Sequence, residues 1–117
     1  MSSLLAGSCP RRTIGIDEAI WEDATIQAKT DGLSMRAVIS ALLAAYNDGT
    51  LPPHLPDYRP TRSKRCTSAY VPEDVWETAA QVRGAGGFPS MSSLIERLLA
   101  TYGHGEIIVE PTARPAW

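Results

Sequence analysis

The sequence predicts a mainly helical protein with a two-stranded antiparallel β-ribbon, in the order β-α-α-β-α-α around one shared core. Two observations carry this prediction. The stretch from Ile16 to Ala24 recurs from Val71 to Ala79, an offset of 55 residues (71 − 16 = 55). Each copy has the pattern of a short strand followed by two amphipathic helices. With roughly 45 residues, neither copy is large enough to build an adequate core alone, so the two are expected to fold against each other.

The repeat divides the 117-residue chain into five parts. An apolar share of 44% is ordinary for a globular protein of this length. Four prolines between the copies remove N–H donors and fix φ, which predicts a semi-stiff connector and not a helix. The expected parts are an N-terminal arm over 1–10, a first strand-helix-helix repeat over 11–49, a Pro-rich basic linker over 50–64, a second repeat over 65–105 and a C-terminal tail over 106–117.

The first repeat opens with a short strand, because Ile14 and Ile16 alternate with Thr13 and Gly15. Asp17 is the expected N-cap of the helix that follows, since its carboxylate can accept from free first-turn amides. This helix should end near Asp31-Gly32 and bury a stripe of Ile20, Ala24 and Ala28, with Trp21 at its margin.

The second helix of this repeat is expected to start after Ser34 as its N-cap and to end at Asn47-Asp48-Gly49. Its apolar face combines branched residues with one aromatic residue at the core edge. The members of this face are Met35, Val38, Ile39, Leu42, Leu43 and Tyr46.

The second repeat follows the same order. Residues 66–71 alternate, and Pro72 is expected at the first helical position, where a missing N–H costs little. Glycines 84, 86 and 87 end that helix, and Ser90 caps the last one, at an offset of 56 from Ser34 (90 − 34 = 56). The expected apolar positions are Val75, Ala79 and Val82, then Met91, Leu94, Ile95, Leu98, Leu99 and the core-edge Tyr102.

In this order and duplicated, these features resemble the ribbon-helix-helix (Arc/MetJ-type) family of DNA-binding proteins over about 11–49 and 65–105. The resemblance implies a tandem pseudo-dimer whose two strands pair within one chain and enter the major groove of double-stranded DNA. Ile14, Ile16, Ala69 and Val71 should then point inward. The opposite set, at the family's base-reading positions, is Arg11, Thr13, Gly15, Cys66, Ser68 and Tyr70.

The resemblance also implies how these positions contact DNA. Arg11 is expected to bind guanine O6 and N7, with a discrimination of about 1–3 kcal/mol, and Thr13 and Ser68 to make less selective hydrogen bonds. Because the two strands differ, the preferred site should be asymmetric. Backbone amides in the first turn of each second helix, together with nearby basic side chains, should bind DNA phosphates. The expected phosphate-binding residues are Arg12, Ser34, Met35, Arg36, Lys64, Arg65, Ser90, Met91, Ser92 and Ser93.

The net charge of −2 and the pI near 5.6 do not by themselves indicate nucleic-acid binding. Basic residues nevertheless precede each copy and acidic residues follow, so one face is expected to be basic. Cys9 and Cys66 suit neither a disulfide scaffold nor a C-x-x-C metal site, and His54 and His104 have no partner at ligand spacing. We therefore expect no metal, no cofactor and no enzymatic activity.

The sequence has neither a signal-peptide pattern nor a membrane span, which predicts a cytoplasmic, nucleoid-associated protein in a bacterium or a phage-infected host. The expected role is that of a transcriptional repressor or regulator. By resemblance to tandem single-chain accessory proteins of plasmid relaxosomes, a plasmid or phage DNA-processing accessory factor is the alternative. Several copies are expected to be able to assemble along DNA.

One further functional alternative remains open, and one structural alternative is disfavoured. In an antitoxin-like or inhibitory module, the tail from Glu106 to Trp117 would bind a protein partner; otherwise it would add a strand or cover the core. A helix-turn-helix protein would place Met35, Ala37 and Ser40 on its reading helix, and these offer few long polar side chains for base edges. Trp21 and Trp76 are interpreted mainly as packing residues, with a contact surface for other copies as the alternative.

Overall fold

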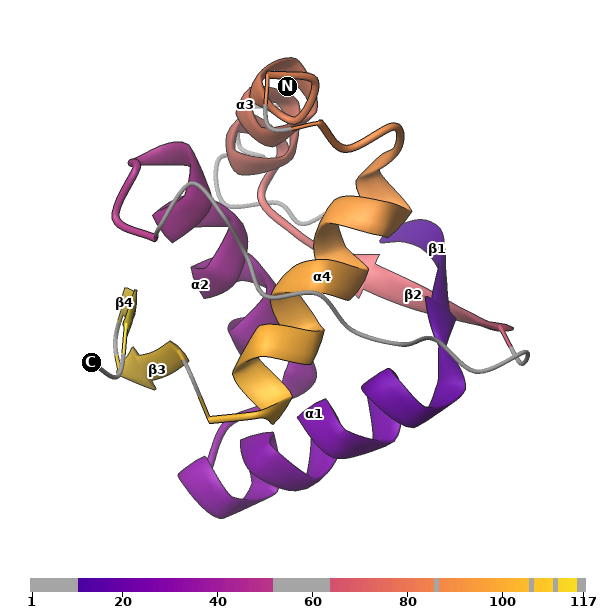
Figure 1. Cartoon of the computed structure of the whole chain (residues 1–117), viewed down its shortest axis with the longest axis vertical. Coiled ribbons are helices and arrows are strands. Elements are labelled where there is room, and N and C mark those ends of the chain that lie inside the picture. The colour runs from indigo at the N-terminus through magenta and orange to yellow at the C-terminus, as the bar shows by residue number, and fades with distance from the viewer. Residues whose placement is uncertain (1–10, 52–63, 86, 106, 111, 116–117) are drawn as a thin grey trace.

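The computed structural model describes residues 11–51, 64–85, 87–105, 107–110 and 112–115 (Figure 1). The predicted arm over 1–10 and most of the linker lie outside these residues. The chain is mainly helical, and the described part contains four helices and two two-stranded antiparallel sheets. In chain order the elements are β1 (Arg11–Asp17), α1 (Glu18–Asp31), α2 (Met35–Asn47), β2 (Lys64–Tyr70), α3 (Glu73–Val82), α4 (Met91–Gly103), β3 (Ile107–Glu110) and β4 (Thr112–Pro115).

Strands β1 and β2 form the predicted antiparallel ribbon, with Thr13 opposite Ser68 near its middle. Alternate residues of the two strands point to opposite faces, as the pleat requires. The inward residues are almost entirely buried: Ile14 is 3% exposed, Ile16 0%, Ala69 1% and, just beyond β2, Val71 0%. The predicted burial of these four inward residues is therefore confirmed.

Short-range capping defines where the helices begin. Asp17 accepts a hydrogen bond from the Ile20 amide, and Ser34 and Ser90 accept from the amides of Ala37 and Ser93 at 3.1 Å. These three predicted N-caps are confirmed.

The placement of Pro72 was wrong by one residue, because it is the N-cap of α3 and not its first helical residue. Its ψ of 140° is extended, and its carbonyl accepts from the Trp76 amide to close the first turn. Pro72 occupies the repeat position of the N-cap Asp17 (72 − 17 = 55), which accounts for the shift. The first helix ends at Asp31, as predicted, and its C-cap Gly32 has a φ of 74°, the left-handed conformation that favours glycine.

The four helices pack crosswise between the two repeats. The first helix of one repeat contacts the second helix of the other, α1 against α4 and α3 against α2, and buried residues of both repeats form one hydrophobic cluster. Tyr102 is fully buried in this cluster, whereas the matching Tyr46 is only partly buried beside Phe88. The expectation that both tyrosines lie at the core edge was therefore wrong for Tyr102, whose position in α4 faces inward.

The C-terminal tail forms its own antiparallel hairpin, β3–β4, which packs mainly on α2. Ile107 and Val109 are 2% and 5% exposed, so this part of the tail covers the core. Figure 1 shows the hairpin and the β1–β2 ribbon on opposite sides of the helices. None of the described helices combines the length and the apolar character that crossing a bilayer requires.

Candidate nucleic-acid interface

The outer face of the β1–β2 ribbon collects the six predicted base-reading positions. The register pairs Arg11 with Tyr70, Thr13 with Ser68 and Gly15 with Cys66, and cross-strand partners share a face. Thr13 and Cys66 are exposed, and the other described side chains on this face are partly exposed. None of the six residues is acidic. The backbone thus presents a narrow, carboxylate-free strip of alternate residues to solvent.

A helix N-terminus lies beside each end of this strip. The Gly15 amide donates to the Ser92 hydroxyl in the first turn of α4 at 3.1 Å. At the opposite end, Arg36 in the first turn of α2 places its guanidinium over the Tyr70 ring, and Ser40, one turn farther along α2, donates from its hydroxyl to the Tyr70 carbonyl at 3.4 Å. The first amides of any α-helix lack intrahelical acceptors, and the helix dipole places partial positive charge there. The ribbon is therefore flanked by two positions suited to anions.

The N-terminal serines of α4 are mainly engaged with each other. Ser90 and Ser93 form a capping box, in which each side chain accepts from the other's backbone amide at 3.1–3.2 Å. The Ser93 hydroxyl also donates to the Ser90 carbonyl at 2.9 Å. Ser92 accepts from Gly15. Backbone amides, more than hydroxyls, are consequently what this helix end offers to an anion.

The two ends of the ribbon carry different side chains. At one end, the Arg36 guanidinium lies over the ring of Tyr70, with its central carbon 5.3 Å from the ring centroid. The corresponding repeat positions are Gly15 (70 − 15 = 55) and Ser92 (92 − 36 = 56). Arg36 and Tyr70 were predicted as separate DNA contacts, and their contact with each other was not expected. Aligning the two repeats shows that this pair of large side chains matches the small residues Ser92 and Gly15.

Arg12 has partners within the chain. Its guanidinium donates to both carboxylate oxygens of Glu73 at 2.9 Å and lies over the Trp76 ring at 4.7 Å from the centroid. In the strand alternation Arg12 belongs with Ile14, on the side opposite the reading face. A phosphate contact by Arg12 stays a prediction, and it would require the guanidinium to leave Glu73.

Among the described residues, none of the outward ribbon positions carries a carboxylate. Exposed carboxylates are carried mainly by α1 and α3, including Glu22 and Asp23 on the first and Asp74 and Glu77 on the second. Hydrogen bonding to Glu73, together with its negative charge, raises the pKa of Glu77. The net charge of −2 is a property of the whole chain and does not describe the ribbon face.

Glu96 is a buried residue that the sequence analysis missed. It is 3% exposed, and its carboxylate accepts from the Asp17 amide at the junction of β1 and α1. The matching position in α2 is Ser40 (96 − 40 = 56), and the residue matching Asp17 is Pro72, which has no amide to offer. Glu96 thus faces Asp17, which has an amide to donate, whereas its counterpart Ser40 belongs with Pro72, which has none. Comparing the two copies of the repeat makes this correlation visible.

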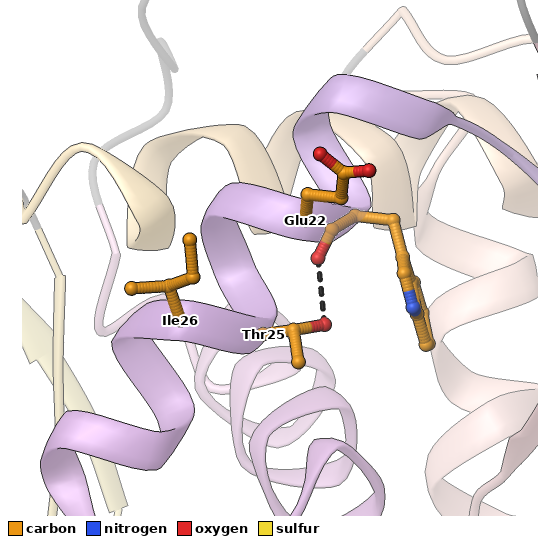
Figure 2. A pocket seen from close by; sticks show the side chains of 4 residues that line it. Glu22, Thr25 and Ile26 are labelled. Carbon is orange, nitrogen blue, oxygen red and sulfur yellow. Dashed lines mark hydrogen bonds between the residues drawn. The ribbon is translucent and has the colours of Figure 1, made fainter.

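A separate surface pocket of about 370 Å³ lies on the outer face of α1 (Figure 2). It is lined by Trp21, Glu22, Thr25 and Ile26, and Ile26 is 63% exposed. The Thr25 hydroxyl donates to the Trp21 carbonyl at 2.7 Å, as Figure 2 shows. One carboxylate and one engaged hydroxyl do not form an acid-base or nucleophilic arrangement.

The described residues contain no group of three or more His, Cys, Asp or Glu side chains placed to hold a metal ion. Comparisons with protein-family models, curated proteins and solved structures found no match to this chain. Of the predicted site residues, the structure brings the six reading positions onto one face and places the first turns of α4 and α2 beside its two ends. The side chains of Arg11, Lys64 and Arg65 lie outside the described part of the structure.

Proposed function

We propose that this chain is a tandem ribbon-helix-helix pseudo-dimer that binds duplex DNA and acts as a transcriptional repressor or regulator. The observation that carries the proposal is the set of six outward ribbon positions, none of them acidic, with the first turns of α4 and α2 beside its two ends. The major groove admits a two-stranded β-ribbon, and helix N-termini beside it can hold the phosphates of both strands.

The pseudo-dimer is supported by the crosswise packing of the helices. Since α1 contacts α4 and α3 contacts α2, neither repeat could bury its apolar helix faces alone. The two strands of the ribbon likewise come from different repeats. One chain then supplies what two identical chains supply in a symmetric dimer, but with two unlike strands.

In this proposal the residues divide into two groups. Arg11, Thr13 and Ser68 read base edges, while the amides at Met35 and Met91 position the protein on phosphates. The tail is a weaker candidate for a partner-docking segment, because Ile107 and Val109 are already buried against the chain's own core.

Fluorescence anisotropy with a duplex selected from random DNA tests the proposal. Arg11→Ala should lower affinity for the selected duplex by roughly 5- to 150-fold, the equivalent of about 1–3 kcal/mol for a bidentate base contact. Lys29→Ala is the matched control, since it also removes one positive charge, from an exposed site near the end of α1. Its effect should stay within about 2-fold.

Two results would contradict the proposal. Absence of duplex binding by the unaltered chain at low salt would exclude DNA as its ligand. Equal losses for Arg11→Ala and Lys29→Ala would show that only net charge matters, and would remove the base-reading role of Arg11. Affinity should also fall steeply as salt is raised, because phosphate contacts release counterions.

A further inference from the structure

The two ends of the ribbon's outer face differ in what they can offer a ligand. At one end stand Tyr70 and the exposed Arg36, and at the other stand their repeat counterparts Gly15 and Ser92. A Cβ added at Gly15 would have no atom within 4 Å, so the space directly beside Gly15 is open. The matching positions therefore carry a cation and an aromatic ring at one end, and a glycine and a serine at the other.

Tyr70 restricts where the Arg36 guanidinium can lie. The Tyr70 carbonyl accepts from the Ser40 hydroxyl, and Tyr70 pairs with Arg11 in the ribbon. The backbone that carries the Tyr70 ring is therefore held by hydrogen bonds. Stacking uses the flat face of the guanidinium and leaves its N–H groups in the plane available for a ligand. An arginine already held in place loses less conformational entropy when it binds.

The repeat positions that match Tyr70 and Arg36 provide no guanidinium at the opposite end. Gly15 has no side chain, and the Ser92 hydroxyl accepts from the Gly15 amide at 3.1 Å. These two positions therefore leave the N-terminus of α4, whose amides suit a phosphate and carry no base preference. One end thus offers a planar bidentate donor, the Arg36 guanidinium. The matching positions at the other end offer only contacts that do not read sequence.

Resting on the proposed function, we propose that DNA recognition is directional: Arg36, oriented by Tyr70, binds guanine O6 and N7 at one end of the site, whereas the matching positions Gly15 and Ser92 at the other end contact only the DNA backbone. Tyr70 is an outward ribbon residue, so the ring under Arg36 draws the guanidinium over the reading face. A guanidinium fork matches the two guanine acceptors. Tyr70 is a positioning residue in this arrangement.

Selection of sites from random duplex DNA, followed by anisotropy titrations, tests this proposal. The unaltered chain should select a guanine at one end of an asymmetric site, and replacing that guanine by adenine should lower affinity roughly 5- to 150-fold. Arg36→Lys keeps the charge and loses the planar fork, so it should abolish that preference and leave affinity for random DNA within about 2-fold. Tyr70→Phe should retain the preference, and Tyr70→Ser should weaken it.

A variant that should gain a guanine preference tests the proposal without relying on a loss of binding. The double substitution Gly15→Tyr with Ser92→Arg copies the Tyr70 and Arg36 pair onto the matching positions at the other end. The space beside Gly15 is open, and its backbone is not in a left-handed conformation. The site selected by this variant should acquire a second guanine at the mirror position. Circular dichroism confirms that the variant is folded before its site is compared.

The outcomes separate this inference from the proposed function. If the unaltered chain binds duplex DNA but selects a symmetric site, or if Arg36→Lys leaves the guanine preference intact, the inference fails and the DNA-binding function stands. Equal loss of affinity for selected and random DNA by Arg36→Lys would mark Arg36 as a phosphate contact and would also overturn it. Failure of the unaltered chain to bind any duplex at low salt would overturn both.

Discussion

The hydrogen bond from the Tyr102 hydroxyl to the Asp31 carboxylate gives the sharpest test of how the two repeats are joined. The bond is 2.7 Å long and links α4 to the last residue of α1. Tyr102 is fully buried, whereas Asp31 is exposed. A hydrogen bond to a charged group contributes about 1.5–3 kcal/mol, and water around Asp31 reduces this. Tyr102→Phe should therefore lower the free energy of unfolding by about 1–2 kcal/mol at pH 7.

The same bond predicts a dependence on alkaline pH. Burial, and then the hydrogen bond and charge of Asp31, raise the pKa of Tyr102 above its ordinary value of 10.0. Because the folded state holds this proton more tightly than the unfolded state, the contribution is complete below pH 10 and is lost as pH rises through the folded-state pKa. Tyr102→Phe should remove this contribution, so the stability difference between wild type and variant should shrink above pH 10.

Tyr46 provides a matched control at the equivalent repeat position (102 − 46 = 56). It is partly buried, and burial alone raises the pKa of its hydroxyl. Tyr46→Phe should change stability by less than about 0.5 kcal/mol. The assay is urea denaturation of both variants and of Asp31→Asn, combined in a double-mutant cycle for the 31–102 pair. Equal losses for the two tyrosine variants, or an undiminished cost of Tyr102→Phe in the Asp31→Asn background, would refute the reasoning.

Two further predictions concern stability and are measured by the same denaturation assay. Glu96→Ala leaves the buried Asp17 amide without its carboxylate acceptor and should cost about 1–3 kcal/mol, clearly more than Ser40→Ala at the matching position, whose bond to Tyr70 is 3.4 Å long. Similar costs for the two variants would contradict the role given to Glu96. Arg12→Ala removes a partly exposed ion pair and a contact with Trp76 and should cost at most about 1 kcal/mol; a loss above about 2 kcal/mol would show that Arg12 is more deeply integrated than its exposure implies.

The elements of this fold follow from short-range patterns. Alternation at Ile14 and Ile16 predicted a strand with one buried face, and Ser34 and Ser90 predicted two helix starts. These features depend on residues within a few positions of one another, so the sequence displays them directly. The Pro72 position was wrong by one residue because an N-cap and a first helical residue are distinguished by a single ψ value.

Pairings between distant residues were decided only by the tertiary structure. Arg12 with Glu73, Asp17 with Glu96 and Tyr102 with Asp31 join residues 61 to 79 positions apart. Local periodicity does not determine which basic side chain pairs with which carboxylate, because that pairing depends on how the helices cross. The doubled pattern of the chain determined the elements and the two faces of the ribbon. The crosswise packing of α1 on α4 and α3 on α2 decided that Arg12 turns to Glu73 on the inner side while Arg36 lies over Tyr70 on the outer face.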